Sequence, residues 1–151
     1  RDYSSYEGAS NDLDLFLVYN SEFVISNSSG ASVLPWLFKK PILVHNFMPV
    51  GIRPIFAENC IFIMKYYYFK GEKVSYHDIP EDLLLCEDFN TLSNRGFTLQ
   101  ENTSEEIKEM VKGYCDYKEK SGIYKEFSFQ VYGGNSKICK SWYKKNELLF
   151  K

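Results

Sequence analysis

Short apolar runs alternate with polar, serine- and glycine-rich stretches along the first third of the chain. Leu13, Phe16 and Leu17 recur at a spacing of three and four, which predicts a short amphipathic helix capped at residues 11–12. Residues 23–25 and 41–44 are apolar runs that contain Val and Ile, and they predict two buried strands. Residues 31–38 predict a short helix between them, and a crossover of that length requires the two strands to be parallel.

The middle of the chain continues this alternation. Residues 60–65 predict a third apolar strand, which the four aromatic residues 66–69 either prolong or follow as a surface loop. A helix is predicted over residues 79–85 after a cap at Asp78, and a short strand over residues 96–100.

The last third opens with a clear helix signal. Thr103 and Glu106 form a T-x-x-E capping box ahead of apolar residues at helical spacing. Beyond residue 116 lysines and aromatic residues dominate, with a turn predicted at residues 133–134. We therefore expect an α/β fold with a doubly wound parallel sheet over residues 1–116. Residues 117–151 are expected to form a helical C-terminal tail that packs on the sheet or on a missing partner.

Composition limits the class of protein. The 151 residues are 44% hydrophobic and 17% aromatic, which excludes a disordered chain and predicts one compact core. The formal net charge of -2 gives no electrostatic reason to expect nucleic-acid binding. No apolar run approaches the roughly 18 residues of a membrane span, so no transmembrane segment is expected. The first residue is Arg1, so we expect a processed chain or a piece of a longer one.

The spacing of the cysteines indicates in which cellular compartment the protein is expected. Four cysteines, more than twenty residues apart and without a C-x-x-C pair, favour reduced side chains and the cytoplasm. Neither histidine lies at metal-ligand spacing from them, so we expect no metal site. Asp12 and Asp14 have the D-x-D spacing of a metal motif, but both fall in the first turn of a predicted helix, where negative charge is stabilising by itself.

The strongest candidate for chemistry is the Ser-Asn-Ser-Ser-Gly stretch at residues 26–30, between a predicted strand and a predicted helix. Small residues and hydroxyl groups at a helix start can hold a phosphate, and the carboxyl end of a parallel strand is where such folds bind ligands. The alternative is that the stretch only caps the helix. It matches neither the dinucleotide fingerprint nor the P-loop.

The next predicted strand ends in His45 and Asn46 at the same edge of the sheet. Asn46 can hydrogen-bond a sugar or a phosphate, or can simply close a turn. His45 is a candidate base, although no carboxylate lies near it in the sequence. The aromatic residues 66–69 can stack on a base or belong to the core.

The ordered series of these segments resembles the donor-binding, C-terminal half of a GT-B type glycosyltransferase family that is associated with bacterial surface-polysaccharide biosynthesis. The resemblance starts with FVISNSSG at residues 23–30 and LFKKPILVHNFMP at residues 37–49. It continues with IFIMK, GEKVS, RGF and ENTSEEI, and it covers roughly residues 12–115.

The resemblance implies a Rossmann-like domain that binds a nucleotide-diphosphate sugar as donor substrate, with no further cofactor. Ser28, Ser29 and Gly30 would hold the diphosphate, Asn46 would line the same cleft, and Lys65 would face a phosphate. The partner would be a missing N-terminal half, which binds the acceptor and supplies the catalytic base. No catalytic residue is therefore assigned. Two alternatives stay open: a fragment similar to sugar-nucleotide 2-epimerases, and a non-catalytic α/β interaction module.

Overall fold

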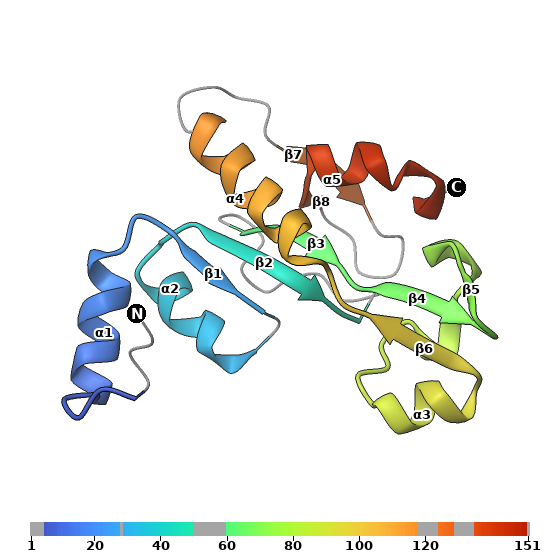
Figure 1. Cartoon of the computed structure of the whole chain (residues 1–151), viewed down its shortest axis with the longest axis horizontal. Helices are drawn as coiled ribbons and strands as arrows, with labels where there is room; N and C mark the ends of the chain where they lie inside the picture. The colour runs from blue at the N-terminus through green and yellow to red at the C-terminus, as the bar shows by residue number, and fades with distance from the viewer. Residues whose placement is uncertain (1–4, 28, 50–59, 118–123, 129–134, 151) are drawn as a thin grey trace.

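The computed structural model describes residues 5–27, 29–49, 60–117, 124–128 and 135–150 (Figure 1). Its helices are α1 (Asn11–Asn20), α2 (Val33–Leu37), α3 (Phe89–Asn94), α4 (Ser104–Tyr117) and α5 (Lys140–Lys145), with 3-10 helices η1 (Gly30–Ser32), η3 (Tyr76–Asp78), η4 (Glu81–Leu83) and η5 (Glu147–Phe150). Its strands are β1 (Val24–Ser26), β2 (Ile42–Phe47), β3 (Cys60–Met64), β4 (Tyr66–Phe69), β5 (Glu72–Lys73), β6 (Phe97–Gln100), β7 (Tyr124–Ser128) and β8 (Asn135–Cys139).

The larger sheet has the strand order β1-β2-β3-β8-β7. The pairs β1–β2, β2–β3 and β3–β8 are parallel, and β7 runs antiparallel to β8 at the edge. The central strand β3 is buried along its whole length, as expected for a strand covered on both faces. The parallel arrangement predicted for the first strands is confirmed, and the chain has a mixed α/β fold. The Rossmann-like, doubly wound assignment stays a prediction.

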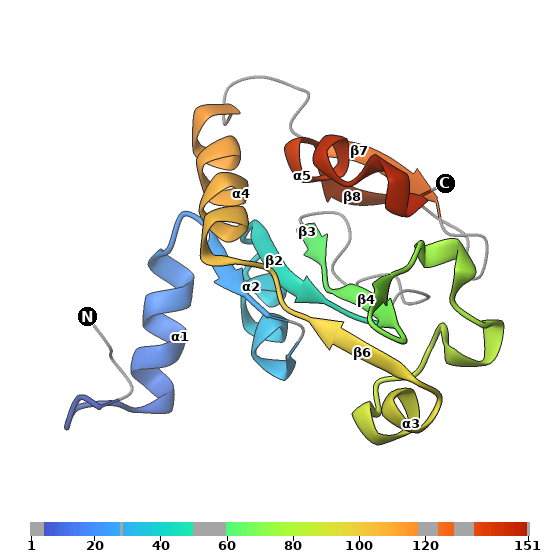
Figure 2. The ribbon, with the colours of Figure 1, turned by 45° about the vertical axis from the view of Figure 1, so that its right-hand side comes forward.

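Helices α4 and α5 lie side by side against this sheet (Figures 1 and 2). α4 contacts β2, and α5 contacts β7 and β8. The α4 ring of Tyr114 lies 5.1 Å from that of Phe23, just before β1, and Trp142 of α5 is buried. These aromatic side chains pack between the helices and the parallel strands, and they complete the core there.

The smaller sheet, β5-β4-β6, is antiparallel and lies beside the larger one (Figure 1). A single residue, Lys65, separates β3 from β4, and its backbone N–H still bonds the carbonyl of Phe47 in β2. β6 leads into α4 through residues 101–103, where the predicted capping box forms: Thr103 N–H donates to Glu106 and Glu106 N–H donates to the Thr103 hydroxyl. We call this region, where β3 passes into β4 and β6 into α4, the sheet junction.

The prediction of a helical C-terminal tail is only partly right. α5 and η5 are helical, but residues 124–128 and 135–139 before them form strands that extend the larger sheet. Their lysine-rich composition gave no clear strand signal, and β8 joins the larger sheet by pairing with β3, which lies far away in the sequence. The turn predicted at residues 133–134 lies outside the described residues.

Three local predictions also need correction. Of residues 79–85 only Glu81–Leu83 are helical, as the 3-10 helix η4, and the α-helix of this region is α3, capped by Asp88. α1 is capped by Ser10, whose side chain accepts the N–H of Leu13, not by residues 11–12. β2 runs to Phe47, beyond the apolar run of residues 41–44 that predicted it, and long-range hydrogen bonds at the junction hold this added part.

Candidate functional site

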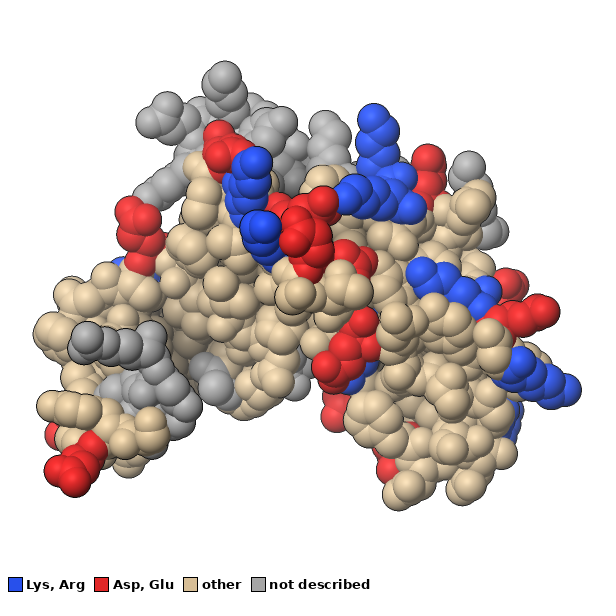
Figure 3. Space-filling model, viewed as in Figure 1, with Lys and Arg blue, Asp and Glu red and all other residues tan. Residues whose placement is uncertain are grey.

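The carboxyl ends of β1, β2 and β3 meet at one edge of the larger sheet. Ser26, the last residue of β1, pairs with Val44 of β2, and Phe47 at the end of β2 pairs with Met64 at the end of β3. In Figure 3 the outline of the molecule is notched at this edge, between the part that carries α2 and the part that carries α3. The predicted site residues thus belong to a part of the fold where ligands of parallel sheets commonly bind.

Serine hydroxyls give the loop after β1 its shape. The hydroxyls of Ser26 and Ser32 lie 2.9 Å apart, and the Ser32 hydroxyl also donates to the carbonyl of Asn27. Ser32 is 2% exposed, although Val33 next to it is exposed. Sequence reasoning missed the role of these two serines, since serines that hold a loop and serines that hold a ligand look alike in a sequence.

Two of the predicted phosphate-binding residues are uncovered. Ser29 and Gly30 are exposed, and no described atom lies within 4 Å of a Cβ built on Gly30. Ser29 precedes η1, but its side chain makes no capping hydrogen bond there; the Ser32 N–H bonds its carbonyl instead. Ser28 lies outside the described residues. The alternative in which Ser29 acts as a side-chain cap is therefore not what the structure shows.

Asn46 is held by the other side of the junction. Its side-chain oxygen accepts the backbone N–H of Asn102 at 2.6 Å, and its own N–H donates to the side-chain oxygen of Asn102 at 2.7 Å. Asn102 also donates to the carbonyl of Met64 at 2.8 Å, so that it ties β2 to the end of β3. Both asparagines are buried, and their separation of 56 residues left no signal in the sequence.

A bulge accompanies this pair. Between Val44 and Phe47, β2 takes one more residue than β3, and Asn46 has φ 53, in the left-handed region that asparagine tolerates better than most residues. His45 lies in the same bulge, half-buried, with Nδ1 3.0 Å from the Asn46 amide nitrogen. Burial lowers the pKa of His45; nearby Glu101 opposes this effect and Lys65 adds to it. The structure thus supplies the carboxylate neighbour that the local sequence lacked.

Lys65 lies where β3 ends, but its charge is already paired. Its ammonium group is 3.2 Å from the Glu101 carboxylate and 5.1 Å from the ring centre of Phe89. The side chain is only 12% exposed, whereas that of Glu101 is 71% exposed. A phosphate at Lys65 would compete with Glu101, whose exposed side chain can turn into solvent at little cost.

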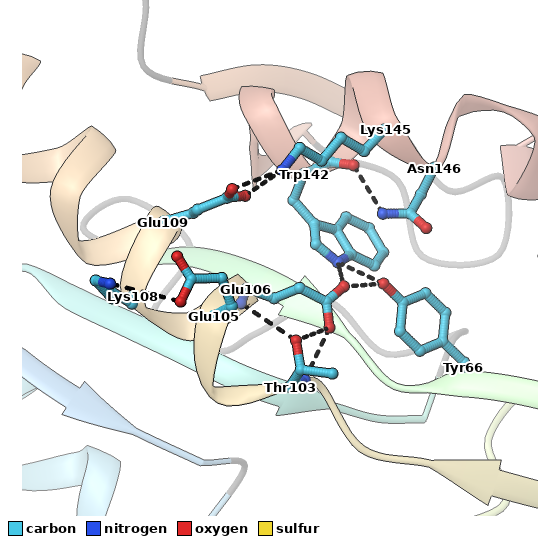
Figure 4. Close-up of polar contacts among 9 residues, drawn as sticks. All are labelled: Tyr66, Thr103, Glu105, Glu106, Lys108, Glu109, Trp142, Lys145 and Asn146. Carbon is cyan, nitrogen blue, oxygen red and sulfur yellow. Dashed lines mark hydrogen bonds and ion pairs between the residues drawn. The ribbon is translucent and has the colours of Figure 1, made fainter.

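A second polar cluster joins β4, α4 and α5 (Figure 4). One oxygen of Glu106 accepts hydrogen bonds from the Tyr66 hydroxyl and, at 3.2 Å, from the indole N–H of Trp142. The other oxygen accepts the backbone N–H and the hydroxyl of Thr103 at 2.8 and 2.9 Å. The sequence indicated the capping box but not the two aromatic partners.

The ionisation of this cluster follows from its contacts. Burial, and then the hydrogen bond and negative charge of Glu106, raise the pKa of Tyr66, so the phenol stays protonated. Burial alone would raise the pKa of Glu106, but the hydrogen bonds from Tyr66, Thr103 and Trp142 outweigh it and lower that pKa. Lys73 lies 3.5 Å over the Tyr66 ring, and its pKa is lowered by burial. Because the donors and acceptors of this cluster bond one another, we expect it to stabilise the fold.

A separate apolar pocket of about 400 Å³ lies at the outer end of the smaller sheet, away from the carboxyl edge. It is lined by Phe69, Val74, Asp78, Pro80, Arg95 and Phe97. None of the predicted site residues takes part in it, and its guanidinium group is paired with Asp82 at 2.7 Å.

The described residues contain no group of three histidine, cysteine or acidic side chains placed to hold a metal ion; Asp12 and Asp14 lie in the first turn of α1. No helix in the described ranges has the length and apolar character that crossing a membrane requires. Comparison with family models, with curated proteins and with solved structures found no match.

Proposed function

We propose that this chain binds a nucleotide-diphosphate sugar, as the Rossmann-like donor half of a GT-B type glycosyltransferase acting in surface-polysaccharide biosynthesis. One observation carries the proposal: the loop after β1 opens at the carboxyl edge of a parallel sheet, with Ser29 and Gly30 uncovered. Parallel α/β sheets bind nucleotides at this edge. The sequence resemblance supplies the class of ligand.

Each residue then has a distinct part in the proposal. Ser28, Ser29 and Gly30 would surround the diphosphate with hydroxyl and backbone N–H groups, and Gly30 would allow close approach of the backbone. Because α2 has only five residues, these loop groups would have to bind the anion without much help from a helix dipole. Lys65 would add positive charge once Glu101 moves away. Asn46, committed to Asn102, would shape the end of β2 rather than contact the sugar.

The donor half would contribute to transfer by holding the diphosphate that departs as the leaving group. Hydrogen bonds and positive charge stabilise the negative charge that develops there as the sugar is transferred. The catalytic base is expected from an acceptor-binding half. A fragment similar to a sugar-nucleotide 2-epimerase would use the same edge, and it would differ by converting its nucleotide sugar without an acceptor.

Titration of the folded chain with UDP and GDP tests the proposal. We expect calorimetry or NMR to detect binding at millimolar nucleotide or below, and Gly30→Val to abolish it, because the added side chain would occupy the space of the anion. Gly113→Val in α4 is the matched control, since no described atom lies near that position either. Absence of binding to the folded wild type, or unchanged binding by Gly30→Val, would refute the proposal.

A second candidate function rests on a different surface. Four apolar side chains of α1 and α2, Phe16, Tyr19, Trp36 and Leu37, are between 45% and 61% exposed. Figure 3 shows few charged side chains over these two helices, whereas many lie along α4 and α5. Such a surface favours an α/β interaction module. Sedimentation at increasing concentration tests self-association: Trp36→Asp should abolish any that is seen, and a monomer throughout would count against a homodimer.

A further inference from the structure

A chain of hydrogen bonds determines which nitrogen of His45 carries its proton. The backbone N–H of Asn102 can only donate, so the Asn46 side-chain atom 2.6 Å from it must be the oxygen. The amide nitrogen of Asn46 then points at Nδ1 of His45, 3.0 Å away. An amide nitrogen can only donate, and Nδ1 must therefore be the unprotonated nitrogen. In the neutral ring the hydrogen is on Nε2.

This tautomer limits what His45 can do. The lone pair of Nδ1 is engaged by Asn46, and Nε2 carries a hydrogen, so neither nitrogen of the neutral ring is available as a base. Among the described residues, no group bonds Nε2. The remaining chemistry of the ring is donation of one hydrogen bond from Nε2.

We propose that His45 is a positioning residue that donates a hydrogen bond from Nε2 to a phosphate oxygen of the bound nucleotide diphosphate. This inference rests on the proposed function and assigns the site a group that the sequence resemblance did not include. His45 lies in the bulge at the carboxyl end of β2, next to the end of β1 from which the Ser29 loop departs. Bulges beside binding sites commonly redirect a side chain out of the strand pattern.

The charged neighbours agree with a neutral donor. Lys65 and Glu101 act on His45 with opposite sign, and burial lowers its pKa below the ordinary 6.5, so the ring is neutral at pH 7.5. Protonation would place a second hydrogen on Nδ1, facing the Asn46 amide that already donates there. The asparagine pair therefore favours the neutral ring, with its one hydrogen on the nitrogen that Asn46 does not engage.

The tautomer can be measured without any ligand. A long-range ¹H–¹⁵N correlation spectrum of the ¹⁵N-labelled chain at pH 7.5 should show Nε2 protonated and Nδ1 unprotonated for His45. His77→Gln identifies the signals, because the chain has only two histidines. The opposite tautomer, or a doubly protonated ring at this pH, would overturn the inference irrespective of nucleotide binding.

The donor role is tested by UDP and GDP titrations of two variants. His45→Phe cannot donate, and we expect it to weaken binding about tenfold or more, the scale of a hydrogen bond to a charged group. His45→Gln keeps one acceptor and one donor, and it should stay within about threefold of the wild type. His77→Phe is the control. Binding should also take up no proton, as calorimetry in two buffers of different ionisation enthalpy can show.

The outcomes separate the two proposals. If the wild type binds and Gly30→Val does not, but His45→Phe binds like the wild type, the proposed function stands and the role of His45 is wrong. Proton uptake on binding would point to a charged imidazolium and would also overturn the neutral-donor role. If the folded wild type binds neither nucleotide, both proposals fail. Should His45→Phe prove unstable, the proton uptake on binding and the tautomer of His45, both measured on the wild type, still test the role.

Discussion

The sheet junction and the loop after β1 use their polar side chains differently. At the junction Asn46, Asn102 and Glu106 form hydrogen bonds to other protein groups. In the loop, the Ser29 side chain is exposed and makes no capping hydrogen bond. The two regions use small polar side chains of similar chemistry. At the junction, buried donors and acceptors satisfy each other and hold β2, β3 and α4 in place. Among the described loop residues, Ser26 and Ser32 are used in this way. Substitutions at the junction should therefore change stability, and substitutions at Ser29 should change binding.

The largest effect is expected for Asn102→Ala. The change removes the acceptor for the Asn46 N–H and the donor for the Met64 carbonyl, both in a buried region. Each unsatisfied buried group costs about 1–3 kcal/mol, so the free energy of unfolding should fall by roughly 3–4 kcal/mol. Urea denaturation measures it. Asn90→Ala, at an exposed position of α3, should change it by less than about 0.5 kcal/mol, and equal effects of the two variants would contradict the role of the asparagine pair.

Glu106→Leu should have the next largest effect. Tyr66 and Trp142 lose the carboxylate that accepts their hydrogen bonds, and the N–H of Thr103 loses its cap. Because hydrogen bonds to a charged group are stronger than neutral ones, we expect a loss of about 2–3 kcal/mol in denaturation experiments. The matched control is Glu105→Leu, one residue away, since Glu105 is 68% exposed and pairs only loosely with Lys108.

We expect the free energy of unfolding of Glu106→Leu and of Glu105→Leu to depend differently on pH. The pKa of Glu106 is lower in the folded chain than its ordinary 4.5, so its contribution is complete above pH 4.5 and is lost as the pH falls through the folded-state value. Stability of the wild type should therefore decline below pH 4.5 more steeply than that of Glu106→Leu. If Glu106→Leu declines as steeply as Glu105→Leu, the carboxylate is not the acid-sensitive group.

The smallest effect, and the one that distinguishes the two regions most directly, is expected for Ser29→Ala. The free energy of unfolding should change by less than about 0.5 kcal/mol, because the side chain makes no capping bond. Binding of UDP or GDP should weaken by roughly 1–2 kcal/mol, about 5- to 30-fold. Thermal unfolding and calorimetry on one preparation measure both, with Ser93→Ala as the control. A drop in stability with unchanged affinity would return Ser29 to the role of a helix cap.

The sequence predicted the elements whose signals are local. β1, β3 and β6 coincide closely with apolar runs, and the capping box of Thr103 and Glu106 starts α4 as expected. The loop of residues 26–30 was located correctly between a strand and a helical turn, since Ser, Asn and Gly act within a few residues of themselves. The sequence did not predict α3, β7 or β8, because short or lysine-rich segments have weak hydrophobic periodicity and are stabilised mainly by the elements that they pack against.

What the sequence alone determined about this protein is the succession of strands and helices and the Ser-Ser-Gly loop, because periodicity, capping and turn chemistry depend on near neighbours. The tertiary structure decided which polar groups face one another: Asn102 across 56 residues from Asn46, Trp142 beside Glu106, and Glu101 beside His45. It thereby left the Ser29 side chain exposed and placed the hydrogen of the neutral His45 ring on Nε2. Such pairings follow from the packing of the two sheets, and no short window of residues contains both partners.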